Sequence, residues 1–370
     1  MHKVKVVFTG GGTGGHVMPL IAVSRALRQL QPEARLFYIG PKKDAQEFKK
    51  EGFIVHPVAA GKLRRYFSFW NIVDTMILMP LGFLQSFWWL TWINPRLVFS
   101  KGGTGALPVC YAARILSIPV FIHESDTVPG LSNKTSGKWA KKIFTSFENV
   151  ENLDSAKVTV VGTPVRKEVS QGKKDSAKAT FKLTFEKPII LVWGGSQGAG
   201  PLNTFLSNIL EDILPSYEVI HVCGQNNYQE VYKETETLDN NLQKYYHLYA
   251  TLDERGVADA LAAADLIVSR AGSASIFEIA AVGKPSILIP LPSSAGNHQV
   301  KNAYQYADTG AAVVIEQANL TTHFFMAEIS KIVSNPHKIE QMRAAALAFA
   351  KPNAAEKIAQ EILNYTTKKQ

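Results

Sequence analysis

Two glycine-rich stretches of this 370-residue chain could bind an anion or a sugar. The first, GGGTGGH, runs from Gly10 to His16, and the second, GGSQGA, runs from Gly194 to Ala199. Each follows an apolar run and precedes a helix-length segment, expected to begin near residues 17 and 202. Glycine allows close backbone approach there, and a helix N-terminus offers unpaired N–H groups. His16 could be a catalytic base or could simply hydrogen-bond to a ligand or to the backbone. Ser196 could contact a diphosphate, although the second stretch could equally be a tight turn.

The first stretch also satisfies the GxGxxG pattern of dinucleotide-binding folds. Such folds usually place Asp or Glu at the end of the next strand, whereas this strand ends in Ile39, Gly40 and Pro41. The sequence holds no GxxxxGK[ST] motif, so a P-loop nucleotidase is not supported. It also lacks DxD, HExxH and CxxC clusters, and we expect no tightly held metal and no cofactor.

Other polar motifs could recognise a nucleotide or a sugar. GTPVR supplies Arg166, whose planar guanidinium suits phosphate, although an isolated Arg is ordinarily a surface ion pair. SRAGSASIFE supplies Glu278, which could accept two hydrogen bonds from a ribose diol or could be merely solvated. The segments 123–134 (HESDTVPGLSNK) and 297–302 (NHQVKN) are dense in side chains that could bind sugar hydroxyls.

These motifs lie between short apolar runs and helix-length periodic segments, an alternation typical of parallel α/β folds. The sequence predicts two doubly wound sheets, whose loops would face one cleft. Similar segments beginning at Leu97 and Leu266 favour two like halves, although a generic β-turn-α similarity would also explain them. The strands expected in the first sheet are 4–8, 36–39, 97–99, 119–122, 143–145 and 158–161, and in the second 189–193, 219–223, 247–249, 266–269, 286–289 and 312–315.

The positive charge lies in one half of the chain. Residues 1–165 carry 20 Lys and Arg against 10 Asp and Glu, whereas residues 166–370 carry 20 against 21. A nucleic acid, an anionic membrane or an acidic substrate could each be the partner. Two cysteines are too few for a disulfide scaffold, and no secretory signal precedes the first strand, so we expect a cytoplasmic protein.

The segment 67–93 holds four of the six tryptophans. Its densest part, 77–93, spans 17 residues and includes Pro80 and Thr91, so we expect it to fall short of a transmembrane helix of about 20 residues. Tryptophans favour a membrane interface, and the basic residues Lys62, Arg64 and Arg65 would add attraction to anionic lipid. Plain packing on its own sheet is the alternative.

The motifs GGTGGH, SKGG, HESDxxPGLSNK, GTPVR, GGSQGA, RAGSxxxxEIAAxGKPSILIP and NHQxKNA, in this order, resemble the MurG family of peptidoglycan glycosyltransferases over nearly the whole chain. The resemblance implies the GT-B architecture, with two Rossmann-like domains around a central cleft. Residues 1–162 would form the acceptor and membrane-associating domain and 163–346 the UDP-sugar donor domain. Residues 347–370 would form a helix that returns to the first domain.

The resemblance implies inverting transfer of N-acetylglucosamine from UDP-N-acetylglucosamine to the C4 hydroxyl of lipid I, giving lipid II and UDP for cell-wall synthesis. It places the enzyme peripherally at the cytoplasmic face of the cell membrane, with other cell-wall or division proteins as further partners. No nucleic acid is expected, because no recognised binding module accompanies the charge. The alternatives are another GT-B lipid glycosyltransferase, such as a diacylglycerol glycosyltransferase, and a non-catalytic nucleotide-sugar sensor.

The resemblance also implies roles for individual residues. His16 is the leading catalytic base, followed by Glu124 and Asp126, and Asp126 stands where many members of the family have Asn in the sequence HEQN. An ionised Asp accepts hydrogen bonds but cannot donate them as Asn does. Thr13, Gly14 and Gly15 would lie near the transferred sugar and the acceptor. The donor would be contacted by Arg166 and Ser196 (diphosphate), Leu252 (uracil), Ser273, Ala274, Ser275 and Glu278 (nucleotide and ribose), and Gln299 and Asn302 (sugar hydroxyls).

Overall fold

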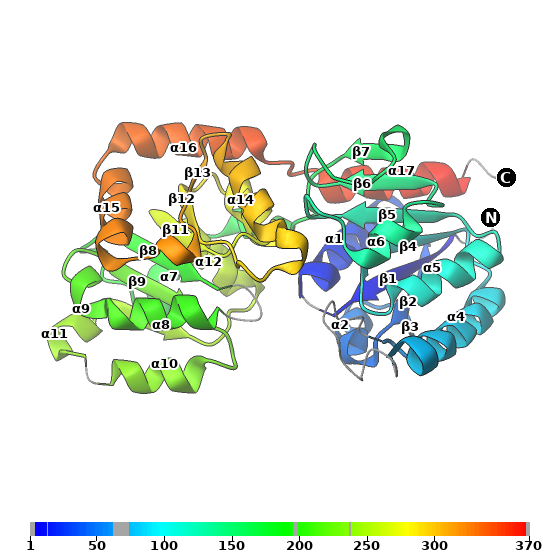
Figure 1. Ribbon diagram of the computed structural model, residues 1–370, viewed down its shortest axis with the longest axis horizontal. Helices are drawn as coiled ribbons and strands as arrows, with labels where there is room; N and C mark the ends of the chain where they lie inside the picture. The colour runs from blue at the N-terminus through cyan, green and yellow to red at the C-terminus, as the bar shows by residue number, and fades with distance from the viewer. Residues whose placement is uncertain (1–3, 13, 62–73, 195–198, 237, 368–370) are drawn as a thin grey trace. The chain divides into compact units, whose positions relative to one another are not determined.

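The structure is a computed structural model that describes residues 4–12, 14–61, 74–194, 199–236 and 238–367 (Figure 1). The chain divides into two compact units. The N-terminal unit comprises residues 1–166 and 351–370, and the C-terminal unit comprises residues 167–350. The chain returns to the N-terminal unit after residue 350, just beyond the end of helix α16 (Pro336–Phe349). The boundary expected from the sequence was between residues 346 and 347.

Over the described residues, the N-terminal unit contains a seven-stranded sheet in the order β3-β2-β1-β4-β5-β6-β7. Each neighbouring pair is parallel. The chain moves from β1 towards one edge through β2 and β3, then returns to β4 and moves towards the other edge, which is double winding. The strands are β1 Lys5–Gly11, β2 Arg35–Gly40, β3 Ile54–Pro57, β4 Leu97–Gly103, β5 Val120–Glu124, β6 Lys142–Thr145 and β7 Val158–Val160.

Alternating side chains of β1 show how helices cover both faces of this sheet. Val6 and Phe8 are buried with α1 and α17, whereas Val7 is buried in a second cluster with α4 and α5. The C-terminal helix α17 lies beside α1, far from it in sequence, and buries Ile358 and Ile362 there (Figure 1). The helices of this unit are α1 Gly14–Leu30, α2 Ala45–Lys50, α4 Met79–Ile93, α5 Ala106–Ile115, α6 Leu131–Ser136 and α17 Ala354–Thr367.

The C-terminal unit has, over its described residues, a six-stranded parallel sheet in the order β10-β9-β8-β11-β12-β13. Its strands are β8 Ile189–Trp193, β9 Glu218–Val222, β10 Tyr246–Tyr249, β11 Leu266–Ser269, β12 Ser286–Leu288 and β13 Ala312–Val314. Its helices are α7 Lys174–Phe181, α8 Gly200–Asn208, α9 Leu210–Ile213, α10 Tyr228–Thr235, α11 Asn240–Gln243, α12 Glu254–Ala263, α13 Ser273–Ala281, α14 His298–Ala307, α15 Thr322–Val333 and α16 Pro336–Phe349.

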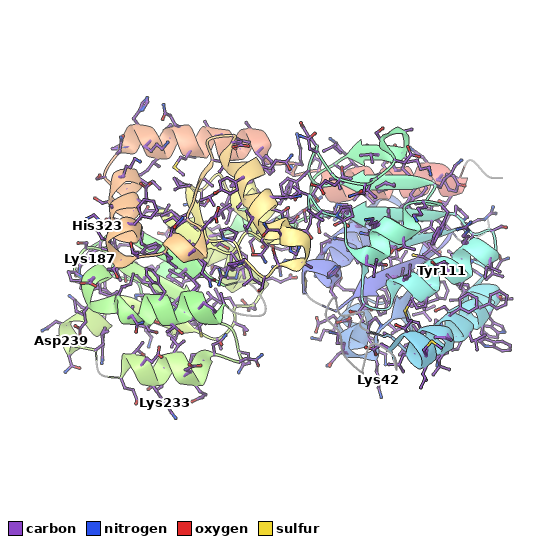
Figure 2. The ribbon with its side chains drawn as sticks, in the orientation of Figure 1. Lys42, Tyr111, Lys187, Lys233, Asp239 and His323 are labelled. Atoms are coloured by element: carbon purple, nitrogen blue, oxygen red, sulfur yellow. The ribbon has the colours of Figure 1, made fainter. Side chains whose placement is uncertain are left out.

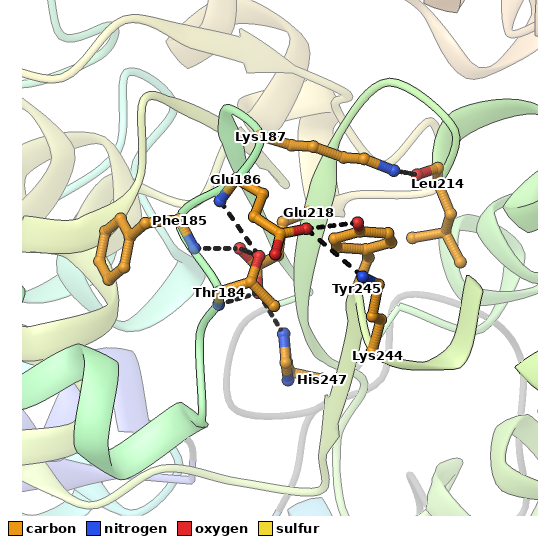
Figure 3. Close-up of polar contacts among 9 residues, drawn as sticks. All are labelled: Thr184, Phe185, Glu186, Lys187, Leu214, Glu218, Lys244, Tyr245 and His247. Carbon is orange, nitrogen blue, oxygen red and sulfur yellow. Dashed lines mark hydrogen bonds and ion pairs between the residues drawn. The ribbon is translucent and has the colours of Figure 1, made fainter. Parts of the chain in front are cut away.

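The buried carboxylate of Glu218 fixes the amino-terminal edge of this second sheet (Figure 3). It accepts hydrogen bonds from the backbone N–H groups of Thr184 and Phe185 at 2.8 and 3.0 Å, and His247 Nε2 lies 2.8 Å from it. The segment leading into β8 is therefore tied to β9 and β10. Because the strands are parallel, the loops at their carboxyl ends lie on the opposite edge.

The predicted fold class, α/β with two doubly wound parallel sheets, is confirmed. Every run expected to be a strand overlaps a strand of the described chain. The prediction missed the edge strand β3, whose first residue, Ile54, is 47% exposed. Its apolar run, residues 53–55, is short and is ended by His56 and Pro57, and proline is disfavoured within a strand.

The helical stretch Asp74–Ile93 is continuous over 20 residues and, within the described chain, is the one helix long and apolar enough to cross a membrane. The helix is thus longer than the 17 residues expected, because it begins at Asp74 instead of Ile77. Pro80 is the second residue of α4 and comes directly after the π-helical turn Asp74–Leu78, so the helix changes from π to α where proline removes a backbone N–H. Thr91 Oγ1 donates to the Phe87 carbonyl at 2.8 Å, so its hydroxyl is satisfied inside the helix.

Candidate functional site

The N-terminal unit has its topological switch point between β1 and β4, and ligands of doubly wound sheets bind outside the carboxyl ends of the strands at such a point. Both strands end there in glycines, with Gly11 paired to Gly103 in the register. A Cβ on Gly103 would meet the Gly11 carbonyl oxygen and would lie 2.9 Å from the His16 ring, and its φ is +79°. Glycine at this position therefore lets the two strand ends and His16 pack closely.

Side chains that follow β2 hold the first glycine stretch in place. Asp44 Oδ2 accepts the Gly12 N–H at 2.9 Å, and Lys43 Nζ donates to the Gly12 carbonyl at 2.7 Å. The Gly12 N–H is thus already bound to a carboxylate, which disfavours an anion at that position. These two contacts could not be anticipated, because Lys43 and Asp44 belong to no glycine motif.

The helix α1 begins at Gly14, three residues before the expected start near Val17. Gly14, Gly15 and His16 therefore form its first turn instead of belonging to the preceding loop. The first N–H groups of a helix have no partner within the helix and are available to a ligand. Glycine destabilises a helix mainly in its middle, so glycines are tolerated in this first turn. Thr13 lies outside the described residues.

The Glu124 carboxylate, at the end of β5, organises the loop that follows it. It accepts hydrogen bonds at 3.0 Å from the backbone N–H groups of Asp126 and Gly130 and from Asn133 Nδ2. The side chain is 3% exposed, and burial raises the pKa of the carboxyl group while the charge of Lys101 opposes that shift. Glu124 thus holds the 124–130 loop in one shape, and Asp126 lies half-buried on that loop.

Lys101, at the carboxyl end of β4, is only 1% exposed. Its Nζ donates to Ser125 Oγ at 2.8 Å, which connects β4 to the loop after β5. Burial lowers the pKa of its amine, and the carboxylates Glu124 and Asp126 oppose that effect. Lys101 belongs to the motif SKGG, but a lysine is ordinarily exposed, so the motif alone does not predict a buried amine.

Asn133 of α6 joins the same two strand ends. Its Nδ2 donates to the His123 carbonyl at 3.0 Å and lies 3.4 Å from the Lys101 carbonyl, in addition to its contact with Glu124. His123 itself is fully buried, with Nε2 2.9 Å from the Gly162 carbonyl oxygen, and burial holds its pKa well below the ordinary value. His123 therefore stays neutral and structural, and Asn133 is a site residue that sequence reasoning missed.

In the C-terminal unit the switch point lies between β8 and β11. The chain passes from β11 through Arg270 to Gly272 and enters α13 at Ser273, so Ser273, Ala274 and Ser275 form the first turn of that helix. Glu278 on the same helix is 7% exposed, which excludes the alternative of a merely solvated glutamate. Ser196, in the loop after β8, lies outside the described residues.

Residues of α14 connect to this switch point. Asn302, fully buried, donates from Nδ2 to the Ala271 carbonyl at 3.3 Å. Gln299 Oε1 accepts the Leu291 N–H at 3.0 Å, so its side chain is bound to the loop that follows β12. The amide oxygen of Gln299 is thus engaged, which leaves its Nε2 as the group able to donate to a ligand.

Arg270 is a second buried cation that sequence reasoning passed over. It is 6% exposed, and its guanidinium donates to the Ile289 carbonyl at 3.1 Å and to Gln317 Oε1 at 2.9 Å. Burial lowers the pKa of this guanidinium. Arg270 therefore fixes the loop after β12 against the start of α13.

Leu252 and Arg166 are the remaining candidates. Leu252 is half-buried, between the end of β10 and Asp253, which caps α12 by accepting the Gly256 N–H at 2.7 Å. Arg166 is half-buried and is the last residue before the chain passes from the N-terminal unit into the C-terminal unit. Within the described residues, no group of three or more His, Cys, Asp and Glu side chains is placed to hold a metal ion.

Comparison with known proteins identifies the family. Residues 6–145 match the N-terminal domain of glycosyltransferase family 28, and residues 189–362 match its C-terminal domain. This chain belongs to glycosyltransferase family 28. The prediction that it is a glycosyltransferase is confirmed. The first matched region carries strands β1 to β6 of the first sheet, and the second carries all the strands described for the second sheet.

Two family 28 relatives are similar along almost their whole length. The protein of Bacillus cereus (strain ATCC 14579) named UDP-N-acetylglucosamine--N-acetylmuramyl-(pentapeptide) pyrophosphoryl-undecaprenol N-acetylglucosamine transferase 1 is 32% identical over 99% of this chain and 100% of its own. A protein of the same name, without the number, from Bacillus cytotoxicus is 34% identical over 96% of this chain and 97% of its own. The crystal structure of Acinetobacter baumannii MurG has the same fold, with a TM-score of 0.76 at 24% identity over 98% of this chain and 99% of that one. The resemblance to the MurG family is thus confirmed.

Proposed function

We propose that this chain transfers N-acetylglucosamine from UDP-N-acetylglucosamine to the C4 hydroxyl of undecaprenyl-pyrophosphoryl-N-acetylmuramyl pentapeptide (lipid I), giving lipid II and UDP. The observation that carries the proposal is the full-length similarity to enzymes named for this transfer, at 32–34% identity across both units. Similarity confined to the donor half would have left the acceptor open.

The proposed donor site is the switch point of the C-terminal unit. The first turn of α13 offers N–H groups and the positive end of a helix, which favour the diphosphate. The buried carboxylate of Glu278 would accept hydrogen bonds from the ribose hydroxyls, and Gln299 would donate from Nε2 to the sugar. The remaining proposed donor contacts are Arg166, Ser196, Leu252, Ser273, Ala274, Ser275 and Asn302.

The proposed acceptor site is the switch point of the N-terminal unit, formed by Thr13, Gly14, Gly15 and the 124–130 loop. His16 is the proposed base that takes the proton of the C4 hydroxyl, because its ring packs against Gly103 at this edge. Glu124 accepts hydrogen bonds from three donors and suits the role of holding the loop. Asp126, on that loop, is the second candidate for base or for orienting the acceptor.

A variant of His16 tests this assignment. A general base contributes about a hundredfold or more to turnover. We expect His16→Ala to lower kcat by at least that factor while the Kd for UDP-N-acetylglucosamine changes less than twofold. His323→Ala, on the exposed part of α15, is the matched control (Figure 2). Near-normal turnover of the His16 variant would refute the role of His16 as base.

The decisive experiment for the whole proposal is transfer of labelled N-acetylglucosamine to lipid I in vesicles that contain anionic phospholipid. We expect labelled lipid II and stoichiometric UDP. Transfer to diacylglycerol instead of lipid I would establish a different lipid glycosyltransferase. Binding of UDP-N-acetylglucosamine without UDP release from donor and acceptor would establish a sensor.

We propose that the N-terminal unit rests on the cytoplasmic face of the membrane through α4 and α5. Tyr111 of α5 is exposed (Figure 2), and Trp88 and Trp92 of α4 are 65% and 77% exposed. The opposite face of α4, including Leu90, is buried on its own unit, which supports peripheral attachment over spanning. Other exposed apolar side chains of this surface are Met76, Ile77, Leu81, Leu84, Phe87 and Ile115.

Vesicle flotation tests the membrane proposal. Replacing Trp88 and Trp92 together by Ser removes two interfacial side chains from the surface and should weaken binding to anionic vesicles at least tenfold, while the unfolding temperature changes little. Reversing the charges of Lys62, Arg64 and Arg65 should weaken binding at low salt more than at high salt. Flotation that is unaffected by both sets of changes would overturn the proposal, even if transfer to soluble acceptor analogues persists.

A further inference from the structure

A buried chain of hydrogen bonds connects β10 and β9 to the helix α8. His221, on β9, is fully buried. Its Nδ1 lies 2.7 Å from the hydroxyl oxygen of Tyr246 on β10, and its Nε2 lies 3.1 Å from Asn203 Oδ1 on α8. Asn203 in turn donates from Nδ2 to the carbonyl of Cys223, directly after β9, at 2.9 Å. The contacts therefore end at the carboxyl edge of the sheet.

The chemistry of these groups allows one direction of donation. The Cys223 carbonyl only accepts, so the NH2 group of Asn203 faces it and Asn203 Oδ1 faces His221. An amide oxygen also only accepts, so Nε2 of His221 carries the ring proton. Burial lowers the pKa of His221 to about 3, and its neutral ring therefore accepts at Nδ1 from the Tyr246 hydroxyl. Each side chain is thus oriented by its neighbour.

The helix α8 depends on Asn203 for its placement. It follows the second glycine stretch and begins at Gly200, next to the switch point of the C-terminal unit. Its N-cap residue, Ala199, has no polar side chain that could cap it. Leu202 and Leu206 bury α8 on the core, but apolar contacts carry no direction. The two hydrogen bonds of Asn203, in the first turn, add that direction.

We propose that His221 is a positioning residue of this transferase: together with Tyr246 it orients Asn203, which holds the first turn of α8 at the UDP-N-acetylglucosamine site. This inference rests on the proposed function and adds residues that the function did not use. His221 is fully buried and cannot itself touch the donor, so its influence passes through Asn203. The proposed acceptor site belongs to the other unit, and its affinity for lipid I should not change.

The test compares two replacements of His221. His221→Met removes both ring nitrogens, whereas His221→Gln keeps an amide N–H that can replace Nε2 as the donor to Asn203. Glu218→Gln alters a buried polar group at the other end of the same strand and is the matched control for a loss of stability. The measurements are the Kd for UDP-N-acetylglucosamine by calorimetry, the KM for both substrates and the unfolding temperature.

We expect His221→Met to raise the Kd and KM for UDP-N-acetylglucosamine about tenfold and to leave the KM for lipid I within about twofold. His221→Gln should bind the donor within about threefold of the parent chain. Glu218→Gln should lower the unfolding temperature while the Kd stays within about twofold. A donor Kd that is unchanged in His221→Met, or that Gln restores no better than Met, would overturn the inference.

A double variant tests the route through Asn203. Because His221 acts on the donor only through that amide, His221→Met should weaken donor binding no further in a chain that already carries Asn203→Leu. Effects that multiply would overturn the inference. If His221→Met does not fold, Tyr246→Phe decides, since it removes only the hydroxyl. It should raise the donor Kd about threefold, and an unchanged Kd would overturn the inference.

The two proposals can fail separately. If the parent chain binds UDP-N-acetylglucosamine but transfers no sugar to lipid I, the proposed function fails and the Kd values still decide the role of His221. If the parent transfers the sugar and His221→Met binds the donor as the parent does, only the inference fails. A parent that binds no UDP-N-acetylglucosamine would overturn both.

Discussion

Replacement of Asn133 by Asp would test how the acceptor edge of the N-terminal unit is built. The change is isosteric, but it replaces an NH2 group by an oxygen at the point where Asn133 donates to the His123 carbonyl and to Glu124 Oε2, both at 3.0 Å. Two hydrogen bonds are lost, and a second buried carboxylate lies next to Glu124. A buried charge without a partner costs about 3–5 kcal/mol. For a domain of this size, that corresponds to a fall of about 10 °C in unfolding temperature.

The pH dependence of the loss gives a sharper criterion. Burial already raises the pKa of Glu124 above its ordinary value of 4.5, and a neighbouring carboxylate raises it further. An acid whose pKa is higher in the folded state stabilises the protein at low pH and loses that contribution as pH rises through the folded pKa. We therefore expect the deficit of Asn133→Asp to grow from pH 4 to pH 7. Chemical unfolding monitored by circular dichroism, with the exposed Asn149→Asp as control, measures it. A deficit that equals the control, or that shrinks as pH rises, would refute this account of the edge.

Three further perturbations test the C-terminal unit. Glu218→Gln places an NH2 group near the backbone N–H groups of Thr184 and Phe185, which now donate to the carboxylate (Figure 3). The change should lower the free energy of unfolding by about 2–4 kcal/mol. Glu186→Gln, a change to an exposed side chain, should have little effect. Burial lowers the pKa of Lys284 to about 8, so the unfolded state binds more protons than the folded state between pH 8 and 10. The free energy of unfolding should therefore rise over this range by up to about 1.4 kcal/mol per pH unit. Lys284→Met should abolish this pH dependence in urea titrations. Arg270→Met should raise the KM for UDP-N-acetylglucosamine about tenfold and leave that for lipid I unchanged, because the contacts that it releases, to the Ile289 carbonyl and to Gln317, both lie in the C-terminal unit. Equal effects on both substrates would contradict this.

The fold could be predicted because most strands of a parallel sheet are buried on both faces and therefore form short apolar runs. The predictions failed where local context decides. β3 has only a short apolar run, residues 53–55, which His56 and Pro57 end, so the sequence indicates no strand of the usual length there. In Asp74–Ile93, Pro80 and Thr91 suggested interruptions, yet the helix continues through both: the π-helical turn Asp74–Leu78 precedes Pro80, and the hydroxyl of Thr91 donates to a carbonyl of the same helix.

The candidate site was predictable to the level of the strand ends. Glycine stretches and polar loops that follow apolar runs mark the carboxyl edge of a parallel sheet, and this placed Glu278 correctly in the helix after its loop. His16 and Glu124 were expected in loops, but His16 lies in the first turn of α1 and Glu124 is the last residue of β5. Which side chains are buried between neighbouring strand ends depends on strand order, which these motifs do not contain. Asn133, which follows β5, reaches the Lys101 carbonyl of β4 only because β4 and β5 are adjacent.

The internal similarity of the two halves gains a physical meaning from the two buried cations. Lys101 follows Ser100 at the end of β4, and Arg270 follows Ser269 at the end of β11, each on the strand next to the first strand of its own sheet. Each donates to the segment after the next strand, Lys101 to Ser125 and Arg270 to the Ile289 carbonyl. A cation at this position is buried and lies within reach of the loop that follows the neighbouring strand. Burial strengthens its hydrogen bonds and makes its removal costly. The Ser-Lys and Ser-Arg pairs therefore mark the same structural role in the two units: a buried cation that binds the neighbouring loop, once at each proposed substrate site. They differ in their acceptors: the guanidinium of Arg270 donates to the Ile289 carbonyl and to the amide oxygen of Gln317, whereas the ammonium of Lys101 donates to the hydroxyl of Ser125.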